Sequence, residues 1–224
     1  MAGETGVRRR RKAERPTEIL QASLEEFSAN GFAATRLEDV ATRAGITKGT
    51  IYIYFGSKED LFIATLKEKS RPMIDNLQAL TREEGPSAFE ILRRHLAFVA
   101  EQMVEDPCGR DILRILLAEG HRFPHVVDRW SNEVLEPILA AVGGVVRQGV
   151  ESGEFRSSAA AEFPQLVMAP IILCNNWLAL FGERRPLDVR GFFEATVDLL
   201  ARGLLAEEPA TSPSAQPSAG TRLR

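Results

Sequence analysis

The chain has 224 residues, of which 44% are hydrophobic, so it can bury a sizeable core in one large domain or two smaller ones. Its formal net charge of -3 argues weakly against a nucleic-acid partner, but the charge is unevenly distributed. Residues 1–58 hold ten basic and seven acidic residues and the remainder holds 18 and 24, which predicts a basic head on an acidic body.

Cysteine usage and hydropathy indicate the compartment. Cys108 and Cys174 lie far apart and match neither a metal-binding spacing nor a disulfide framework. We expect no uninterrupted apolar run long enough to span a membrane, and the basic N-terminus lacks the apolar segment of a secretory signal. The sequence therefore predicts a reduced, cytoplasmic protein with no membrane partner.

Residues 1–14 form a basic arm in which Arg8 to Lys12 are consecutive cations. No apolar periodicity accompanies these cations, so we expect the arm to be disordered when free. Two roles stay open for it. The arm could enter a minor groove, or it could be a solvated tail that adds only non-specific attraction to DNA.

A first helix is predicted over residues 17–30, where Leu20, Leu24 and Phe27 recur at spacings of four and three. Gly31 would end this helix. We expect the helix to brace the two that follow by supplying the third wall of a small core, without direct chemistry of its own.

Thr35 and Glu38 have the spacing of a capping box, in which the hydroxyl accepts a backbone N–H and the carboxylate reaches back to the cap residue. They predict a second, short helix. Gly45 would end it by adopting the left-handed conformation that a helix favours at its C′ position. The predicted inner face consists of Leu37, Val40, Ala41 and Ala44.

Thr47 is the predicted cap of a third helix, Lys48–Phe55, and Ser57 with Asp60 repeats the capping signature for a fourth. A helix, a glycine turn and a second helix form the outline of a helix-turn-helix. The sequence therefore predicts a DNA-binding domain over residues 15–60.

The third helix has an unusual surface. If Ile51 and Phe55 face the core, Tyr52 and Tyr54 are left outside, where phenols suit phosphate hydrogen bonds and contacts in a major groove. Gly49 costs about 1 kcal/mol of helix propensity, which the close approach of another molecule would explain. A generic helical hairpin with surface tyrosines is the alternative.

The runs TRLEDVATRAGI and TKGTIYIYFGSKEDLF resemble the N-terminal DNA-binding domain of the TetR family of transcriptional repressors, over Glu14–Leu66. The resemblance implies a three-helix DNA-binding head, a larger helical ligand-binding body, and a homodimer that releases DNA when a small molecule binds. One departure is Ile53, where many members carry a second aromatic residue. This departure affects the expected base preference and not the fold.

Carried over by position, the resemblance places Thr35 and Thr47 on phosphates at helix N-termini and Lys58 on a further phosphate. It places the remaining polar side chains of the third helix in the groove. The candidate DNA-binding residues are Thr35, Arg36, Thr47, Lys48, Gly49, Thr50, Tyr52, Tyr54 and Lys58.

Residues 61–206 read as an all-α body. The helix that begins after Ser57 continues to about Leu80 past Pro72, which predicts a bend or a boundary near Arg71. In the family this helix joins head to body. Further helices are predicted around Phe89–Val99, Ile112–Leu117 and Val126–Gly149, with a turn at 121–124.

The last two predicted helices, over residues 159–181 and from Pro186 onward, are more apolar than one body can readily hide. Pairing them with their copies in a second chain would give a four-helix interface. Residues 207–224 are rich in proline, serine and alanine and are expected to be disordered.

The resemblance places an effector cavity within the body. For each candidate residue ordinary core packing is the alternative, except that the Asn175-Asn176 pair in an apolar helix needs polar partners. The expected effector is small and hydrophobic or amphipathic. The candidates are Phe98, Met103, His121, Met168, Cys174, Asn175 and Trp177.

No metal, cofactor or enzymatic activity is predicted. His121 and His125 are four apart, but Phe123-Pro124 between them makes a continuous helix, and hence a shared metal, improbable. No nucleophile elbow, phosphate-binding glycine loop or zincin signature occurs. The sequence therefore predicts a dimeric regulator of a palindromic operator, with a constitutive DNA-binding protein that lacks an effector as the alternative.

Overall fold

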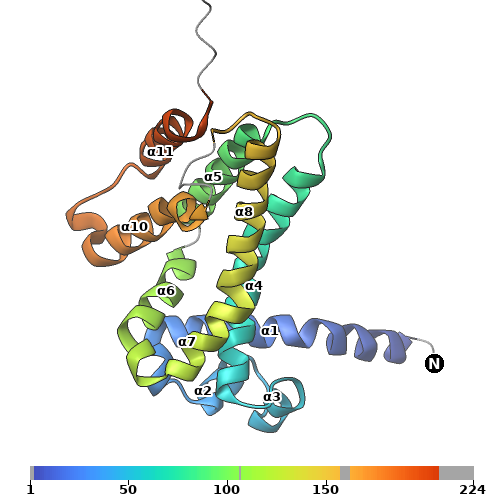
Figure 1. The fold of residues 1–224 in the computed structure, drawn as a ribbon. Helices are drawn as coiled ribbons and strands as arrows, with labels where there is room; N and C mark the ends of the chain where they lie inside the picture. Colours follow the sequence, from blue (N-terminus) through green and yellow to red (C-terminus); the bar gives the residue numbers. More distant parts are fainter. Residues whose placement is uncertain (1–2, 106, 157–161, 207–224) are drawn as a thin grey trace, which may run out of the picture.

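The computed structural model describes residues 3–105, 107–156 and 162–206, with side chains described for 15–105, 113–156 and 162–206. Within these ranges the chain is all-α, as predicted, with a single isolated bridge between Phe155 and Leu205. Figure 1 shows a small head built by the first three helices and a larger body above it, with α4 running through both.

The head consists of α1 (Gly3–Ala34), α2 (Leu37–Arg43) and α3 (Lys48–Tyr54). Its core is apolar and well covered. Phe27 packs edge-on against Phe62 of the following helix at a centroid distance of 4.8 Å, and Val40 and Ile51 are fully buried. Burial of such side chains contributes roughly 1.5–3 kcal/mol each, so this small core holds α3 rigidly.

The basic arm differs from its prediction. The structure continues α1 back to Gly3, where the sequence analysis expects disorder over residues 1–14, and this part of the helix projects away from the other elements (Figure 1). Arginine, lysine, glutamate and alanine all have high helix propensity, so an existing helix extends through them. Apolar periodicity reports burial and therefore does not detect such an extension.

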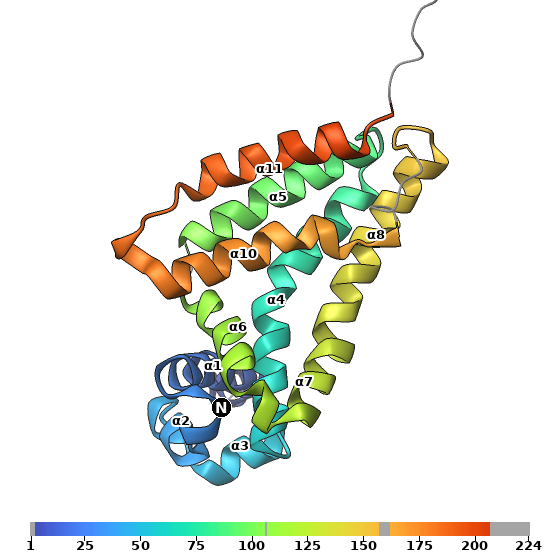
Figure 2. The same ribbon diagram turned by 60° about the vertical axis from the view of Figure 1, so that its left-hand side comes forward.

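α4 (Lys58–Arg82) is the long connecting helix. It passes Pro72 without ending, so no boundary lies near Arg71, and the predicted extent to about Leu80 is confirmed. Because α4 begins beside α3 and ends in the body, it joins the two parts of the molecule mechanically (Figure 2).

The body packs its helices around α4 and α5. A widened π turn precedes Pro137, which lacks an N–H and whose ring would clash with the carbonyl four residues earlier. The elements here are α5 (Ala88–Glu105), α6 (Pro107–Glu119), η1 (Gly120–Arg122), α7 (Pro124–Trp130), the π turn η2 (Ser131–Leu135) and α8 (Glu136–Glu151).

The last elements are α10 (Gln165–Phe181), η3 (Gly182–Arg184) and α11 (Val189–Leu204). They lie on the outside of the body, with α11 packed along α5 (Figure 2). Asp188 caps α11 by accepting the Gly191 N–H at 3.1 Å. Large apolar side chains of this part stay exposed, namely Phe163, Leu166, Ile172, Leu173, Leu180 and Leu199.

α10 bears on one further expectation. By length and composition the segment Gln165–Arg184 could cross a membrane, since it has 20 residues and a mean hydropathy of 1.4. Asn175-Asn176 and Glu183-Arg184 interrupt this segment, so it is not the uninterrupted apolar run whose absence the sequence predicts. Core helices of soluble proteins pass the same test, but only 22% of this window is buried within one chain. The predicted tail at 207–224 and the side chain of Cys108 lie outside the described residues.

Candidate nucleic-acid interface and effector cavity

The turn between α2 and α3 has the predicted geometry. Gly45 adopts a φ of 64°, and its N–H bonds to Thr42 O at 3.1 Å while the N–H of Ile46 bonds to Ala41 O at 2.9 Å. These two bonds close the C-terminus of α2 in the manner of a Schellman motif. The tight turn fixes the angle at which α3 leaves α2.

α3 is anchored at both ends. Thr47 caps it as predicted, since its hydroxyl oxygen accepts the Thr50 N–H at 3.3 Å, and Ser57 caps α4 by accepting the Asp60 N–H at 3.0 Å. Ile51 is fully buried and Phe55 packs against the core, which confirms the predicted inner face of the helix.

The outer face of α3 combines a cation, a phenol and a large aliphatic side chain. Tyr52 is 48% exposed and Ile53 is 77% exposed, and Lys48 lies over the Tyr52 ring at 5.7 Å from its centroid. An isoleucine this exposed in a folded helix has no packing function in the single chain. The sequence marks Ile53 only as a departure from the family pattern and not as a surface residue, so we add Ile53 to the candidates for base contact.

Glu38 would compete with a DNA phosphate for the ammonium group of Lys48. Its Nζ donates to Glu38 Oε1 at 2.7 Å, and this hydrogen bond lowers the pKa of Glu38 and raises the pKa of Lys48. Both groups are exposed, so the pair is easily broken when a phosphate replaces the carboxylate.

Gly49 and Tyr54 fall on different surfaces. Gly49 is exposed, and a methyl group added there would meet nothing closer than Thr47 Oγ1 at 3.8 Å. Tyr54 is half-buried and packs against the core, with its ring 6.5 Å from that of Phe55. Tyr54 therefore forms the edge of the predicted groove-facing surface and Tyr52 its centre.

Thr35 does not form the predicted capping box. Its hydroxyl donates to Gly31 O at 2.7 Å and to Glu26 O at 3.1 Å, the side chain is 2% exposed, and α2 has Arg36 as an N-cap without a side-chain bond. Thr35 follows the break in α1 at Gly31, and its hydroxyl points back to these carbonyls. Thr35 therefore offers no hydroxyl to a phosphate.

Lys58 is also committed to the protein. Its Nζ donates to the carbonyls of Phe32 at 2.9 Å and of Ala33 and Thr35 at 3.2 Å each, and it lies 4.7 Å from the centre of the Phe32 ring. A cation is stabilised where helix C-terminal carbonyls converge. Lys58 is thus bonded to the end of α1 in the free protein, and its contact with a DNA phosphate stays a prediction.

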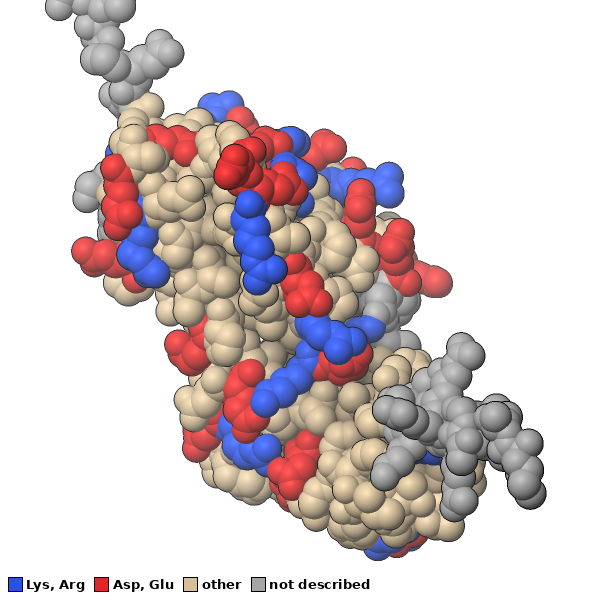
Figure 3. All heavy atoms as spheres, turned by 90° about the vertical axis from the view of Figure 1, so that its right-hand side faces the viewer, with Lys and Arg blue, Asp and Glu red and all other residues tan. Residues whose placement is uncertain are grey.

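The net positive charge of residues 1–58 is unevenly distributed along the sequence. Residues 15–58 hold five basic and five acidic residues, so the excess of positive charge lies in residues 1–14. Among the described side chains of the head, Arg43 is bonded to Glu25 and Glu26, whereas the exposed guanidinium of Arg36 makes no hydrogen bond or ion pair. On the face in Figure 3 the two signs of charge alternate without a large area of either.

An apolar cavity of about 280 Å³ lies inside the body, near the lower end of the range of roughly 300–1,000 Å³ for small-molecule sites. Three predicted effector residues line it, namely Met103, Met168 and Asn175. The other lining residues are Leu66, Lys69, Ser70, Pro72, Met73, Val99, Gln102, Leu113, Leu116, Trp130, Val134, Leu135, Ile138, Ile171 and Ile172.

The remaining predicted effector residues lie elsewhere. Phe98 and Cys174 are not among the lining residues, and Trp177 donates to Arg185 O at 3.0 Å and packs on Phe181. His121 is exposed in η1, and Phe123 separates it from His125 of α7, so the predicted break in the helix is confirmed. Within the described residues no three His, Cys, Asp or Glu side chains cluster.

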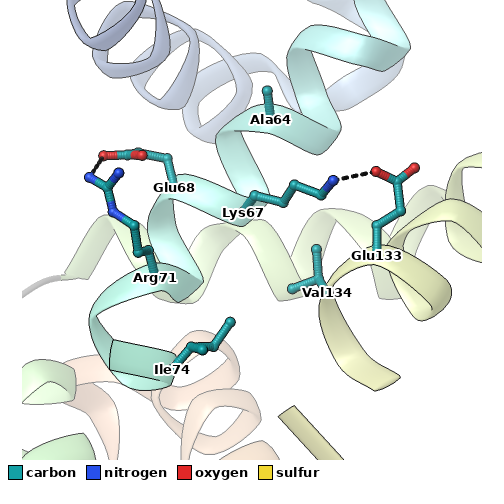
Figure 4. A pocket seen from close by; sticks show the side chains of 7 residues that line it. All are labelled: Ala64, Lys67, Glu68, Arg71, Ile74, Glu133 and Val134. Carbon is teal, nitrogen blue, oxygen red and sulfur yellow. Dashed lines mark hydrogen bonds and ion pairs between the residues drawn. The ribbon is translucent and has the colours of Figure 1, made fainter. Parts of the chain in front are cut away.

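A second hollow of about 370 Å³ lies on the outer side of α4, between α4 and η2 (Figure 4). Its charged side chains are already paired, Lys67 with Glu133 and Arg71 with Glu68. These pairs leave no cation or carboxylate of the hollow unmatched. The apolar cavity is therefore the better candidate for the effector.

Residues 19–65 match the family described as bacterial regulatory proteins, tetR family, and residues 91–197 match the AefR-like transcriptional repressor C-terminal domain. The regulator RutR of Escherichia coli K12 is 39% identical over 148 residues, which cover 65% of this chain and 68% of RutR. The repressor NicS of Pseudomonas putida is 30% identical, with 77% and 81% covered. The chain belongs to the TetR family.

Solved TetR-family structures share this fold at low identity. SmeT of Stenotrophomonas maltophilia in complex with triclosan superposes with a TM-score of 0.72 at 20% identity, covering 91% of this chain and 99% of SmeT. FadR of Bacillus subtilis in complex with stearoyl-CoA superposes with a TM-score of 0.67 at 23% identity, covering 84% and 98%. This TetR-family chain is thus a DNA-binding transcriptional regulator, and its relatives are regulators and not enzymes.

Proposed function

We propose that this TetR-family protein is a homodimeric repressor that binds a palindromic operator through α3 and is released by a small apolar or amphipathic effector. The observation that carries the proposal is the surface of α3, a rigidly anchored helix that exposes Tyr52 and Ile53 to the outside. A regulator of this kind acts on chromosomal DNA, and we therefore infer that it is cytoplasmic.

Different residues of the interface are proposed to contact bases and phosphates. Tyr52, Ile53 and Thr50 are proposed to contact base edges, because they occupy the outer face or flank of α3. Phosphate contacts are assigned to Arg36, Thr47 and Lys48, which lie at the N-termini of α2 and α3, where helix dipoles also favour an anion. Gly49 lets the DNA backbone approach the first turn of α3.

The homodimer is supported by α10 and α11. Their buried residues face the body, whereas Leu166, Leu173 and Leu199 are more than half exposed. Monomeric proteins rarely leave such contiguous apolar surface uncovered. A second copy placed on this face would bury the apolar side of α10 and would present two copies of α3 to two half-sites.

The effector site is assigned to the apolar cavity. Met73, Met103 and Met168 supply deformable side chains, and Asn175 supplies a polar group that can orient a ligand. Two structurally similar regulators hold amphipathic or aromatic molecules, SmeT with triclosan and FadR with stearoyl-CoA. We therefore propose that this cavity accepts an apolar tail or ring with one polar end.

Selection of bound duplexes from random DNA tests the proposal, followed by fluorescence anisotropy of the selected duplex with and without triclosan or stearoyl-CoA. A palindromic consensus and release by either ligand would support it. Tyr52→Phe should reduce the preference for the selected sequence over random DNA, whereas Lys48→Ala should weaken both about equally. An asymmetric consensus, or normal binding by both variants, would overturn the assignment of α3.

A further inference from the structure

Two backbone N–H groups of the head have their hydrogen-bond acceptor in a residue of the body. Gly31 breaks α1 with φ 78° and ψ 174°, and the N–H groups of Phe32 and Ala33 that follow the break donate to the carboxylate of Glu119 in α6. The distances are 3.1 Å from Phe32 N to Oε1 and 2.7 Å from Ala33 N to Oε2.

Gly31 and the carboxylate of Glu119 lie too close together for a side chain at position 31. A Cβ atom at position 31 would collide with Glu119 Oε1, so the glycine serves both the left-handed conformation and the approach of the carboxylate. The carbonyls of Phe32 and Ala33 are already bonded to Lys58. Both sides of this peptide segment are therefore bonded, by a lysine from α4 on one side and by Glu119 from the body on the other.

The same helix that carries Glu119 also borders the effector cavity. Leu113 and Leu116 of α6 line the cavity, and Leu116 lies one helical turn before Glu119. α6 packs against α1 of the head and against α10 of the body, as Figure 2 shows. A displacement of Leu116 by a molecule in the cavity would therefore be transmitted along one rigid turn to the carboxylate.

We propose that Glu119 is the positioning residue through which occupancy of the cavity reaches the DNA-binding head. This inference rests on the proposed function, in which a molecule in the cavity weakens operator binding. A carboxylate bonded to two N–H groups holds the head in one orientation, and its movement rotates α1 and the helices packed on it. The spacing of the two α3 helices in a dimer then changes.

A substitution that fills the cavity with a larger side chain tests this inference without a known effector. Met168→Trp adds volume inside the cavity, and the selected duplex serves as the DNA probe. With Glu119 present, the substitution should weaken DNA binding by about 5–150-fold, the usual range for coupled sites. In the Glu119→Gln background the same substitution should change the affinity by less than about twofold.

Glutamine is the informative replacement because it keeps the shape of the side chain but turns one acceptor into a donor that faces an N–H group. Hydrogen exchange at the Phe32 and Ala33 amides should accelerate in Glu119→Gln, which verifies that the contact has been lost. Glu101→Gln, at an exposed residue of α5 that does not line the cavity, is the matched control and should leave the response to Met168→Trp intact.

Each outcome decides between the hypotheses. If Met168→Trp weakens DNA binding equally with Glu119 and with Gln, cavity coupling exists but does not pass through Glu119, and the inference is wrong. If Met168→Trp does not fold, Gln102→Trp fills the same cavity from α5, and Glu119→Asp replaces an unfolded Gln variant. If neither occupant affects DNA binding with Glu119 intact, effector control itself fails, and the inference fails with it.

Discussion

At Lys58, three backbone carbonyls surround the ammonium group, whereas the guanidinium of Arg36, at the start of α2, has no hydrogen-bond or ion-pair partner among the described side chains. Both cations lie in the predicted DNA-binding domain, residues 15–60, and both are candidate DNA-binding residues by sequence. Their different surroundings lead to opposite expectations for substitution.

Lys58→Met should destabilise the protein and Arg36→Ala should not. Hydrogen bonds to a charged group contribute roughly 1.5–3 kcal/mol when buried, and because Lys58 is partly exposed we expect a loss of about 1–2 kcal/mol in the free energy of unfolding. Arg36→Ala should instead reduce the salt dependence of DNA binding by about one phosphate contact. Urea denaturation and anisotropy at several salt concentrations measure the two effects, and an exchange of the two phenotypes would contradict the assignment.

Gly49→Ala should separate stability from DNA binding. The added methyl group has room in the free protein and improves helix propensity, so the free energy of unfolding should rise by about 0.5–1 kcal/mol. If DNA approaches this turn, the same methyl group should weaken binding of the selected duplex. Gly203→Ala, at a helical glycine with open space around it in α11, controls for the gain in stability alone. Unchanged DNA affinity would remove Gly49 from the interface.

Local patterns predicted the caps and turns well, because their partners lie within a few residues. Thr47, Ser57 and Gly45 behave as expected on that basis. The carbonyls that Lys58 contacts lie 23 to 26 residues earlier, which no local pattern encodes. Thr35 departs from its predicted capping box because its hydroxyl donates backward to Gly31 O and Glu26 O, four and nine residues earlier, and not forward to α2. The sequence marks Ile53 only as a departure from the family pattern, because the exposure of its side chain depends on how α3 packs on the core of the head.

At the scale of the elements, α4 and α5 enclose a polar pair that the apolar periodicity of these helices conceals. His95 of α5 is 2% exposed, its Nδ1 lies 2.9 Å from Asn76 Oδ1 of α4, and its Nε2 has no hydrogen-bond partner among the described residues. Burial lowers the pKa of His95 to about 4 from its usual value of 6.5.

This histidine should make the body sensitive to acid. Above pH 6.5 it is neutral in both states, but between pH 6.5 and 4 the unfolded chain takes up the proton first, so stability falls by about 3 kcal/mol over this window. His95→Gln should flatten that part of the profile of unfolding free energy against pH. His125→Gln, at an exposed histidine, should retain the slope. Equal slopes in all three proteins would refute the role of His95.

The helices themselves were largely predictable, since amphipathic spacing, prolines and caps mark most of their bounds. Two features were not. The extension of α1 to Gly3 has no apolar periodicity to mark it, and the contact between Glu119 and the turn after Gly31 joins residues 86 and 87 apart. Contacts of that separation arise only when the body packs on the head.

At the scale of the whole molecule, the proposed homodimer would cover the apolar outer face of α10 and α11. Leu173→Arg should place a charge in that interface, abolish the dimer, and reduce affinity for a two-half-site duplex by well over tenfold, because only one α3 then binds. Light scattering and anisotropy measure the two effects. Leu117→Arg, at a leucine of α6 that is 61% exposed, is the matched control and should remain dimeric.

The most direct test of the account is a stoichiometric anisotropy titration of the selected duplex at a concentration well above its dissociation constant. We expect the signal to saturate at two chains per duplex, and we expect scrambling of one half-site to weaken binding sharply. Saturation at one chain per duplex, or equal affinity for the scrambled duplex, would contradict the claim that this TetR-family protein reads a palindrome as a homodimer.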